Sequence, residues 1–477
     1  MRDANTARRR ARVTHVSTPA VEDADRRFVF HPFTQLGQHE RSGSPTMIVE
    51  GSGARVTDIQ GRTYIDGMAG LWCVNVGYGR AELGEALRSS AERLGYYHAF
   101  SSMGTDTPAL LAERLVQMAP AGMSKVFFGC TGSDANDTQV KLVWFYNNVL
   151  GRPEKKKIIA RRRGYHGVSV MSASLTGLPG LHASFDLPLP MVRHTTPPHR
   201  LWEAEPGMTD EEFSLKLAGD LETLILAEGP DTVAAFIAEP VMGAGGVLVP
   251  PDTYFARIQE VLRRYDVLLI ADEVITAFGR LGQWYGSDLL GLEPDLITVA
   301  KGLTSGYVPL SGSIVSERVW RVLVEGSEEG PFGHGYTYSA HPLAAAVAMA
   351  NLDLIEGEGL LEQAVERGAL LHALLRELLA DHPLVGEVRG TGLLAALEFV
   401  AAKDPATPFD PALKVGARVA RRCLEHGLIT RALPAADTIS FSPPFVITED
   451  EVAELARIAR LAADEVAVEL RSEGLLA

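Results

Sequence analysis

The chain of 477 residues has few cysteines and no cysteine motif. Cys73, Cys130 and Cys423 are widely separated and show no Cys-x-x-Cys spacing. Such spacing fits neither the disulfide framework of a small secreted domain nor a zinc site. It fits a reducing compartment, so we expect a cytoplasmic protein without a bound metal.

Long apolar runs and an excess of positive charge are also missing. No apolar run approaches the roughly 18 residues that a membrane-spanning helix needs. The net charge is −15 and the pI about 5.4, which disfavours a nucleic-acid-binding surface. Apolar residues make up 46% of the chain, and its length predicts more than one domain. We therefore expect a globular protein that binds neither nucleic acid nor a membrane.

The N-terminus is basic. The stretch MRDANTARRRARVTHV carries five arginines and lacks the apolar core of a secretory signal. An organelle transit peptide and a disordered basic tail are both consistent with this composition. We favour the tail and assign it to residues 1–28.

Most of the chain alternates between strand-like and helix-like segments. Segment 47–67 is typical of short antiparallel strands with glycine turns. In segment 252–265 the apolar residues recur at helical spacing, with Asp252 placed as the N-cap. Apolar strands separated by helices predict an α/β fold, with a mostly parallel sheet covered by helices on both faces. The strand candidates are KVFFGC (125–130), KKIIAR (156–161), AAFIAEPV (234–241), VLLIADEV (267–274) and DLITVAKG (295–302).

The C-terminal part has a different pattern. A long helix at about 359–380 precedes two strand-like stretches, VRGTGLLAALEFV and TISFSPPFVI. Thr448 and Glu451 have the spacing of a capping box ahead of a last helix. We predict a smaller α+β domain at 346–477, joined by an N-terminal segment at 29–78, and a large domain at 79–345.

Polar residues follow the predicted strands at the end where ligands collect in parallel sheets. The first strand leads into TGSDANDT (131–138), where Gly132 and Ser133 either bind an anion at a helix N-terminus or belong to a plain N-cap made by Ser133 or Asp134. Tyr165 and His166 lie in the glycine loop RRGYHG (162–167). Such a loop taken alone is only a tight turn.

Two charged residues end apolar strands. Asp272 follows VLLIA, and Lys301 follows DLITVA. A buried lysine is either paired, here with Asp272, or used as an amine whose pKa burial lowers. A phosphate cradle, an aromatic ring, an acid and a lysine together meet the needs of pyridoxal phosphate, which acts as an electron sink. The set therefore favours the second interpretation of Lys301.

These blocks resemble those of the class III aminotransferases, which have the fold type I architecture of pyridoxal-phosphate enzymes. The resemblance runs from about His31 to the C-terminus. It is closest to the amine:pyruvate, or ω-, transaminases. The blocks are DGMAGLWCVNVGYGR, TGSDANDT, GYHG, AEPVMGAGGVLVPP, ADEVITAFGRLG, PDLITVAKGLTSGYVPL and GHGYTYSAHPLAAA.

The resemblance implies a role for each cofactor residue. Lys301 is expected to bind the cofactor as a Schiff base and to shuttle the substrate proton. Asp272 is expected to keep the pyridine nitrogen protonated, between Val274 on one face of the ring and Tyr165 on the other. The other expected cofactor residues are His166, Gly132, Ser133, Glu239, which could pair with an arginine, and Thr337, which would reach the phosphate of a neighbouring subunit.

The implied substrate side uses fewer residues. Trp72 and Phe100 resemble the aromatic residues that line the amine pocket together with Tyr165, and Ala244 leaves room in the smaller pocket. Arg431 would pair with the carboxylate of pyruvate or alanine, for which a guanidinium is well suited. Cys130 departs from the family pattern, which has an asparagine there.

The expected activity is transfer of an amino group from a primary amine or ω-amino acid to pyruvate, by a ping-pong mechanism. Shared active sites imply a homodimer or a dimer of dimers. An aminomutase, racemase or epimerase, decarboxylase or phospho-lyase would use the same scaffold. A non-catalytic pyridoxal-phosphate regulator fits less well, because only about 30 residues precede the resemblance. Strand alternation sends Asp272 and Glu273 to opposite faces, which leaves Glu273 without an identified partner.

Overall fold

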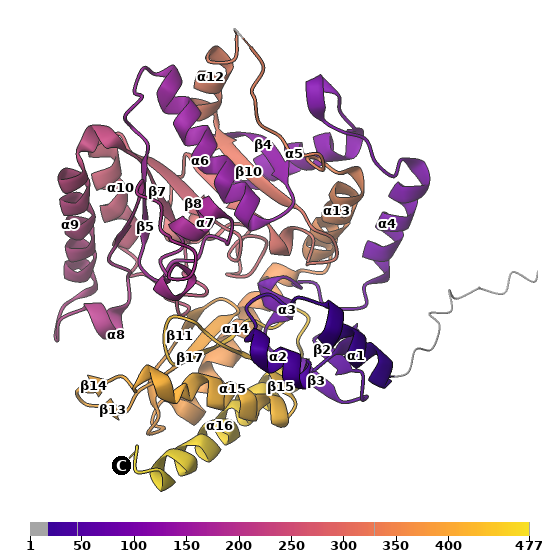
Figure 1. The fold of residues 1–477 in the computed structure, drawn as a ribbon, viewed down its shortest axis with the longest axis vertical. Helices are drawn as coiled ribbons and strands as arrows, with labels where there is room; N and C mark the ends of the chain where they lie inside the picture. Colours follow the sequence, from indigo (N-terminus) through magenta and orange to yellow (C-terminus); the bar gives the residue numbers. More distant parts are fainter. Residues whose placement is uncertain (1–17, 45, 329, 477) are drawn as a thin grey trace, which may run out of the picture.

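The computed structural model describes residues 18–44, 46–328 and 330–476, and its centre is a seven-stranded sheet (Figure 1). Six strands point the same way, and β10 is antiparallel to both of its neighbours. The order of the strands is β4 (Met123–Gly129), β10 (Ser311–Ser316), β9 (Leu296–Val299), β8 (Leu268–Asp272), β7 (Val233–Ala238), β5 (Lys157–Arg161) and β6 (Val192–Thr195). The predicted α/β fold with a mostly parallel sheet is confirmed.

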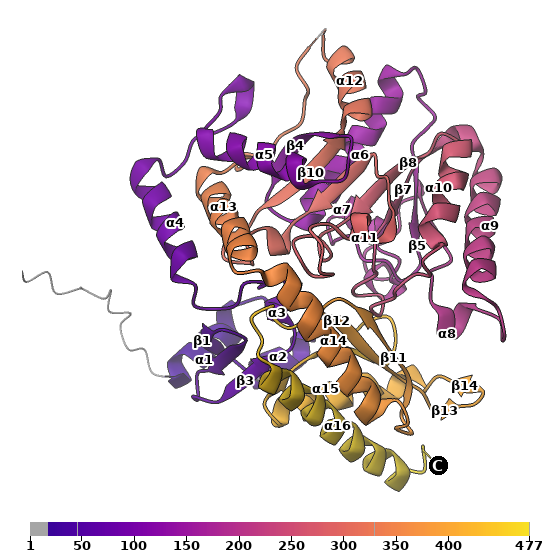
Figure 2. The same cartoon turned by 180° about the vertical axis from the view of Figure 1, so that it is seen from behind.

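Helices cover both faces of this sheet, as Figures 1 and 2 show from opposite sides. On β8, Leu268 and Ile270 pack in the cluster that contains helix α6, whereas Leu269 and Ala271 pack in the cluster on the other face. This alternation continues to the end of the strand, so Asp272 faces α6. One layer contains α6 (Gly132–Val149), α7 (Val170–Leu175) and α12 (Glu317–Glu325), and the other contains α5 (Asp106–Met118), α9 (Asp210–Glu228), α10 (Tyr254–Arg264) and α13 (Pro342–Gly357).

The chain's two ends meet in a smaller domain, which lies below the large sheet in both views. Its four-stranded sheet is β11 (Val385–Thr391), β12 (Leu394–Phe399), β17 (Thr438–Phe441) and β16 (Arg431–Ala432). A second sheet joins the N-terminal strands β1 (Ile48–Ser52), β2 (Arg55–Asp58) and β3 (Thr63–Asp66) to β15 (Leu428–Ile429). The pairing of β3 with β15 is parallel and ties the N-terminal segment to the C-terminal part.

Helices α14 (Leu360–Leu379), α15 (Val415–Glu425) and α16 (Glu449–Ser472) pack on this domain. The predicted capping box is present, with Thr448 as the N-cap of α16 and Glu451 as its partner. Among the described residues no helix is both long and apolar enough to cross a membrane. The other helices are α1 (Thr18–Phe28), α2 (Leu36–Ser42), α3 (Ala69–Trp72), α4 (Ala81–Arg93), α8 (Arg200–Glu203), α11 (Gly286–Leu290) and the short 3-10 turns η1 (Phe100–Ser102), η2 (Pro179–Leu181), η3 (Pro230–Thr232), η4 (Lys301–Leu303) and η5 (Pro411–Leu413).

Several local predictions need correction. Thr18–Phe28, assigned to a disordered tail, is helix α1, while residues 1–17 lie outside the described part of the chain. The N-cap of α10 is Thr253 and not Asp252. Helix α13 runs through the predicted boundary at residue 346 and packs on α4 and α5 of the large domain. The division at that residue therefore cuts a helix that belongs with the large domain.

Candidate active site

A cavity opens at the carboxyl ends of the central strands, where the sequence predicted a ligand site. Lys301 follows β9 and Asp272 ends β8. Every predicted cofactor residue except Thr337 lines this cavity. The full lining is Gly132, Ser133, Asn136, Tyr165, His166, Gly167, Glu239, Val241, Asp272, Val274, Ile275 and Lys301.

Asp272 is buried and held by two side chains on the α6 side of the sheet. Its Oδ2 atom accepts a hydrogen bond from Asn136 Nδ2 at 2.8 Å and lies 2.8 Å from His166 Nδ1. Among the described residues, Oδ1 accepts a hydrogen bond only from the backbone N–H of Val274, at 3.2 Å. The carboxylate is thus fixed in orientation and keeps acceptor capacity on Oδ1 for a donor in the cavity.

Glu273, the neighbouring acid, is buried in the opposite layer. Its carboxylate accepts hydrogen bonds from the N–H of Gly286 at 3.0 Å and from the N–H and hydroxyl of Ser287, both at 2.6 Å. The hydroxyl of Thr276 also donates to it. The start of α11 is therefore the partner that the sequence left unidentified, and Glu273 has a structural role.

The N-terminus of helix α6 forms one wall of the cavity. Thr131 is its N-cap and shares a capping box with Asp134, so Ser133 is not used as the cap. The first N–H groups of a helix have no acceptor within the helix, and those of Gly132 and Ser133 therefore suit an anion. Gly132 is required here because a Cβ atom would lie 3.0 Å from Val274 Cγ2. Gly132 and Ser133 thus line the cavity at the helix N-terminus where the sequence predicts an anion site.

Cys130, the departure from the family pattern, does not disturb this loop. Its backbone N–H donates to Asp134 Oδ2 at 3.0 Å, and Ser311 Oγ donates to the other oxygen of the same carboxylate at 2.9 Å. The Cys130 side chain is not required for either bond. Asp134 therefore holds the turn that an asparagine side chain at position 130 was expected to support.

Lys301 and Arg431 lie on the same indole ring. Lys301 Nζ is 5.1 Å and Arg431 Cζ 5.3 Å from the centroid of the Trp72 ring. Within the described chain, Lys301 Nζ has no hydrogen bond or ion pair, so the alternative of a Lys301–Asp272 salt bridge is wrong. Burial lowers the pKa of Lys301, which favours the neutral amine that a nucleophile needs.

The backbone at Lys301 is in the left-handed region, with φ of 42°. Such a conformation is uncommon for a residue other than glycine and occurs where surrounding structure enforces it, often at functional sites. Trp72 has φ of 59°. Two residues whose side chains meet in the cavity region are therefore both held in unfavourable backbone conformations.

Tyr165 and Ala244 are positioned by one buried acid. Glu239 accepts hydrogen bonds from the N–H of Tyr165 at 3.1 Å and the N–H of Gly243 at 2.8 Å. The prediction that its carboxylate pairs with an arginine is wrong, because Arg161 donates instead to the main-chain carbonyl of Glu239. Tyr165 and Ala244 lie in the same apolar cluster as Trp72. The structure thus brings together all the predicted substrate residues except Phe100.

Phe100 and Thr337 lie apart from this cavity. Phe100 is 47% exposed, and its ring lies where a Cβ atom on Gly335 would contact it at 3.2 Å. Thr337 is exposed, and its carbonyl accepts a hydrogen bond from Tyr96 at 2.5 Å. Neither residue lines the cavity of its own chain.

Sequence reasoning missed Asn136, which connects the two sides of the site. Its amide donates to Asp272 and to the carbonyl of His166 at 2.7 Å, and its oxygen accepts from Thr298 Oγ1 at 2.8 Å. Helical spacing could have identified it, because Asn136 lies one turn after Gly132 and so faces the same side of α6. The apolar lining residues Val241 and Ile275 gave no comparable signal.

Known proteins similar to this chain match almost its whole length. Residues 37–462 match the family described as aminotransferase class-III. The uncharacterized aminotransferase y4uB of Sinorhizobium fredii is 53% identical over 457 residues, which are 95% of this chain and 98% of that protein. The diaminobutyrate–2-oxoglutarate transaminase of Halomonas elongata is 51% identical over 461 residues, again 95% and 98%. The solved ω-transaminase of Pseudomonas jessenii in complex with PMP superposes with a TM-score of 0.92, at 46% identity, covering 94% of this chain and 99% of that one.

Proposed function

This chain belongs to the class III aminotransferases, which depend on pyridoxal 5′-phosphate, and we propose that it moves an amino group from a primary amine or ω-amino acid to pyruvate. The product from pyruvate is alanine. The amine donor and the keto acid would react in separate half-reactions at the same site, which is a ping-pong cycle. The proposal fits a site in which Lys301 offers an amine and in which Arg431 has no carboxylate partner among the described residues.

The residues of the cavity fit this cofactor. The free N–H groups of Gly132 and Ser133 would hold its phosphate, and Oδ1 of Asp272 would accept the ring N–H. Tyr165 and Val274 line the cavity where the ring would lie. Lys301 Nζ, which is free of competing bonds within the described residues, would carry the cofactor.

The chain's own residues divide the chemistry between them. The cofactor supplies an electron sink for the substrate carbon. Asp272 stabilises positive charge at the ring nitrogen, and Asn136 and His166 keep its carboxylate in place. Lys301 Nζ takes the proton from the substrate carbon and returns it, for which a lowered pKa is an advantage.

We assign recognition of the substrate carboxylate to Arg431. The environment of Arg431 is the observation that most directly supports pyruvate as the acceptor. Arg431 lies next to Trp72, and among the residues that the structure describes its guanidinium has no carboxylate partner. Burial lowers the pKa of Arg431, so a bound carboxylate would relieve an unfavourable charge. A planar guanidinium binds a carboxylate with two hydrogen bonds.

A panel of amine donors with pyruvate and 2-oxoglutarate tests this proposal. We expect alanine to form in an amount equal to the donor consumed. Glutamate formed faster from 2-oxoglutarate than alanine from pyruvate would overturn the choice of acceptor. Carbon dioxide or racemised amino acid without alanine would overturn transamination and favour a decarboxylase or racemase.

The variant Arg431→Ala tests whether Arg431 acts in the half-reaction with pyruvate and not in the half-reaction with the amine. We expect kcat/KM for pyruvate to fall by about 100-fold, because two charge-assisted hydrogen bonds are lost. The value for a plain amine should stay within about twofold, since such a donor has no carboxylate. Arg421→Ala is the matched control, because Arg421 is 61% exposed and pairs only loosely with Glu425. Equal losses for pyruvate and the amine would remove Arg431 from carboxylate recognition.

The assembly is part of the same proposal. Exposed Phe100 lies next to Gly335, and exposed Thr337, two residues after Gly335, is bound by the hydroxyl of Tyr96. In a homodimer, or a dimer of dimers, this surface would complete the partner's active site at the phosphate and the amine pocket. Sedimentation of the wild-type enzyme as a monomer at working concentration would contradict this, whereas a cytoplasmic location stays a prediction.

A further inference from the structure

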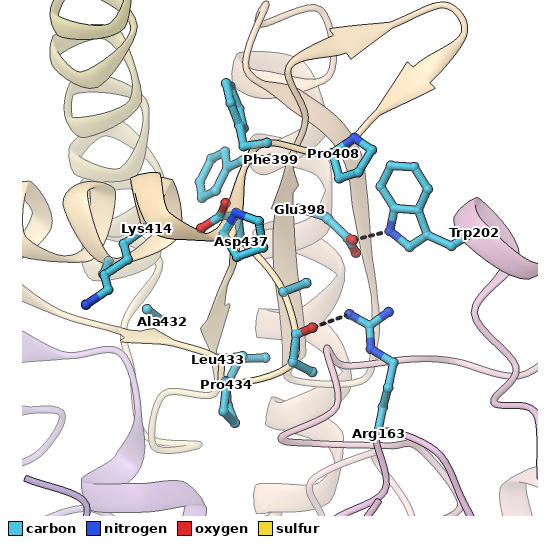
Figure 3. A pocket seen from close by; sticks show the side chains of 15 residues that line it. Arg163, Trp202, Glu398, Phe399, Pro408, Lys414, Ala432, Leu433, Pro434 and Asp437 are labelled. Carbon is cyan, nitrogen blue, oxygen red and sulfur yellow. Dashed lines mark hydrogen bonds between the residues drawn. The ribbon is translucent and has the colours of Figure 1, made fainter. Parts of the chain in front are cut away.

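Glu398 is a buried carboxylate at the junction of the two domains. It lies on β12, and its side chain is 1% exposed. Trp202 Nε1 donates to Oε1 at 2.5 Å, while His199 Nε2 and Arg389 Nη1 lie 3.0 Å and 2.5 Å from Oε2. Figure 3 shows Trp202 reaching Glu398 from the large domain. A buried carboxylate is tolerated when it is paired in this way.

From Glu398 a chain of hydrogen bonds leads to the hairpin that carries Arg431. Arg163 Nη1 donates to His199 Nδ1, because a guanidinium has only donors. His199 must then carry its hydrogen on Nε2, from which it donates to Glu398. Burial lowers the pKa of His199, which is consistent with this neutral form. Arg163 Nη2 in turn donates to the carbonyl of Ala435 at 3.1 Å (Figure 3).

The hairpin formed by β16 and β17 is held in the small domain, where β17 pairs with β12. Its turn, Ala432 to Asp437, borders a cavity of about 620 Å³ that Arg163, Trp202 and Glu398 also line (Figure 3). Side chains that border a cavity lack packing partners on that side. The bond from Arg163 to Ala435 therefore ties the turn of the hairpin, which borders this cavity, to the large domain.

Other bonds hold the remaining parts of the substrate pocket. The N–H of Tyr165 is bound by Glu239, and Arg389 Nε donates to the carbonyl of Gly246, two residues after Ala244. Removing the side chain of Arg163 would thus release the turn of the Arg431 hairpin from the large domain, while Glu239 and Arg389 would still bind Tyr165 and Gly246. Of these parts of the pocket, the Arg163 side chain donates directly to the hairpin.

We propose that Arg163, held by His199 and Glu398, is a positioning residue that sets where Arg431 meets the substrate carboxylate. Arg163 acts from the large domain, across the domain junction, on a residue of the small domain. The inference rests on the proposed role of Arg431 in binding pyruvate. It goes beyond that role, because it assigns substrate specificity to a residue outside the catalytic cavity.

The hydrogen bonds from Glu398 through His199 to Arg163 form a relay, and steady-state kinetics of the cofactor-loaded enzyme test it. Arg163→Ala is expected to lower kcat/KM for pyruvate roughly tenfold, the effect of one lost hydrogen bond from a charged group. The value for a plain amine should change by less than about twofold. Arg163→Lys should recover part of the loss, since an ammonium can still donate to the Ala435 carbonyl. The control is Arg162→Ala in the same loop, because Arg162 is half exposed and pairs with Glu203 on the surface.

The double variant Arg163→Ala with Arg431→Ala distinguishes a positioning role from a structural one. If Arg163 acts through Arg431, its removal has no further effect on pyruvate once Arg431 is gone. Additive losses, or equal losses for pyruvate and amine in Arg163→Ala, would overturn the proposal. A loss in Arg431→Ala without one in Arg163→Ala would overturn the relay alone. No loss in Arg431→Ala would overturn both the relay and the proposed function.

Discussion

Asp272 and Glu273 are adjacent acids that face opposite layers of the fold, and we predict opposite consequences for their substitution. Asp272→Asn keeps the size of the side chain but removes the charge that would stabilise a protonated ring nitrogen. Glu273→Ala removes the acceptor of the hydrogen bonds that fix the start of α11. The first variant should lose activity and the second should lose stability.

The structure gives the size of the second effect. Without Glu273, the N–H groups of Gly286 and Ser287 stay buried without an acceptor, and each such group costs about 1–3 kcal/mol. The hydroxyls of Thr276 and Ser287 can rotate toward other acceptors and add less. We therefore expect a loss of roughly 2–6 kcal/mol, a large part of the 5–15 kcal/mol that is typical of a folded domain. Glu273→Gln keeps one acceptor oxygen and should lose about half as much.

Denaturant unfolding and turnover are measured on the same samples. Glu273→Ala should unfold at a lower denaturant concentration, with kcat per cofactor-loaded molecule within about twofold of wild type. Asp272→Asn should keep its unfolding midpoint and lose about 100-fold or more in kcat, as expected when an electrostatic stabiliser is removed. If Glu273→Ala kept wild-type stability, or lost turnover as severely as Asp272→Asn, the assignment of the two acids to separate layers would be refuted.

Two further predictions concern the cofactor site. Gly132→Ala places a Cβ atom 3.0 Å from Val274 and should weaken cofactor binding about tenfold in a titration of the cofactor-free enzyme. The control is Gly219→Ala, whose added Cβ atom meets no other atom within 4 Å. Equal cofactor affinities of the two variants would contradict the close contact at Gly132. Lys301→Met should raise the melting temperature of the cofactor-free enzyme at neutral pH, because burial lowers the pKa of Lys301 from its usual 10.5. Between the folded and unfolded pKa values the unfolded chain binds more protons, so wild-type stability rises with pH and the advantage of Lys301→Met shrinks toward pH 10.5; an advantage independent of pH would contradict this.

Residues at strand ends could be predicted from sequence because the signal there is local. An apolar run followed by Asp272 or Lys301 marks both the strand and the edge where it ends. The Gly132–Ser133 turn identifies a helix N-terminus without knowledge of the tertiary fold. Strand alternation is also a local pattern, and it assigned Glu273 to the correct face of the sheet. It could not identify the partner of Glu273, because α11 begins at Gly286, well beyond the strand.

Features that depend on distant contacts were not predictable in this way. Strand β10, SGSIVS, consists largely of small and polar residues and was not among the predicted strands, although it lies inside the sheet between β4 and β9. The carboxylate of Glu239 was assigned to an arginine, but the loop geometry presents two backbone N–H groups to it. The relay from Glu398 to Arg163 joins residues more than 200 positions apart, which no local pattern can indicate.

The indole of Trp72 covers Lys301 and Arg431 as well as shaping the pocket. Both side chains approach the same ring, so a smaller residue there would admit water next to Lys301. Because burial is the main cause of the lowered pKa of Lys301, hydration would raise that pKa toward its usual value. A smaller residue at position 72 would therefore admit larger amines but would shift the pH range of activity toward alkaline values.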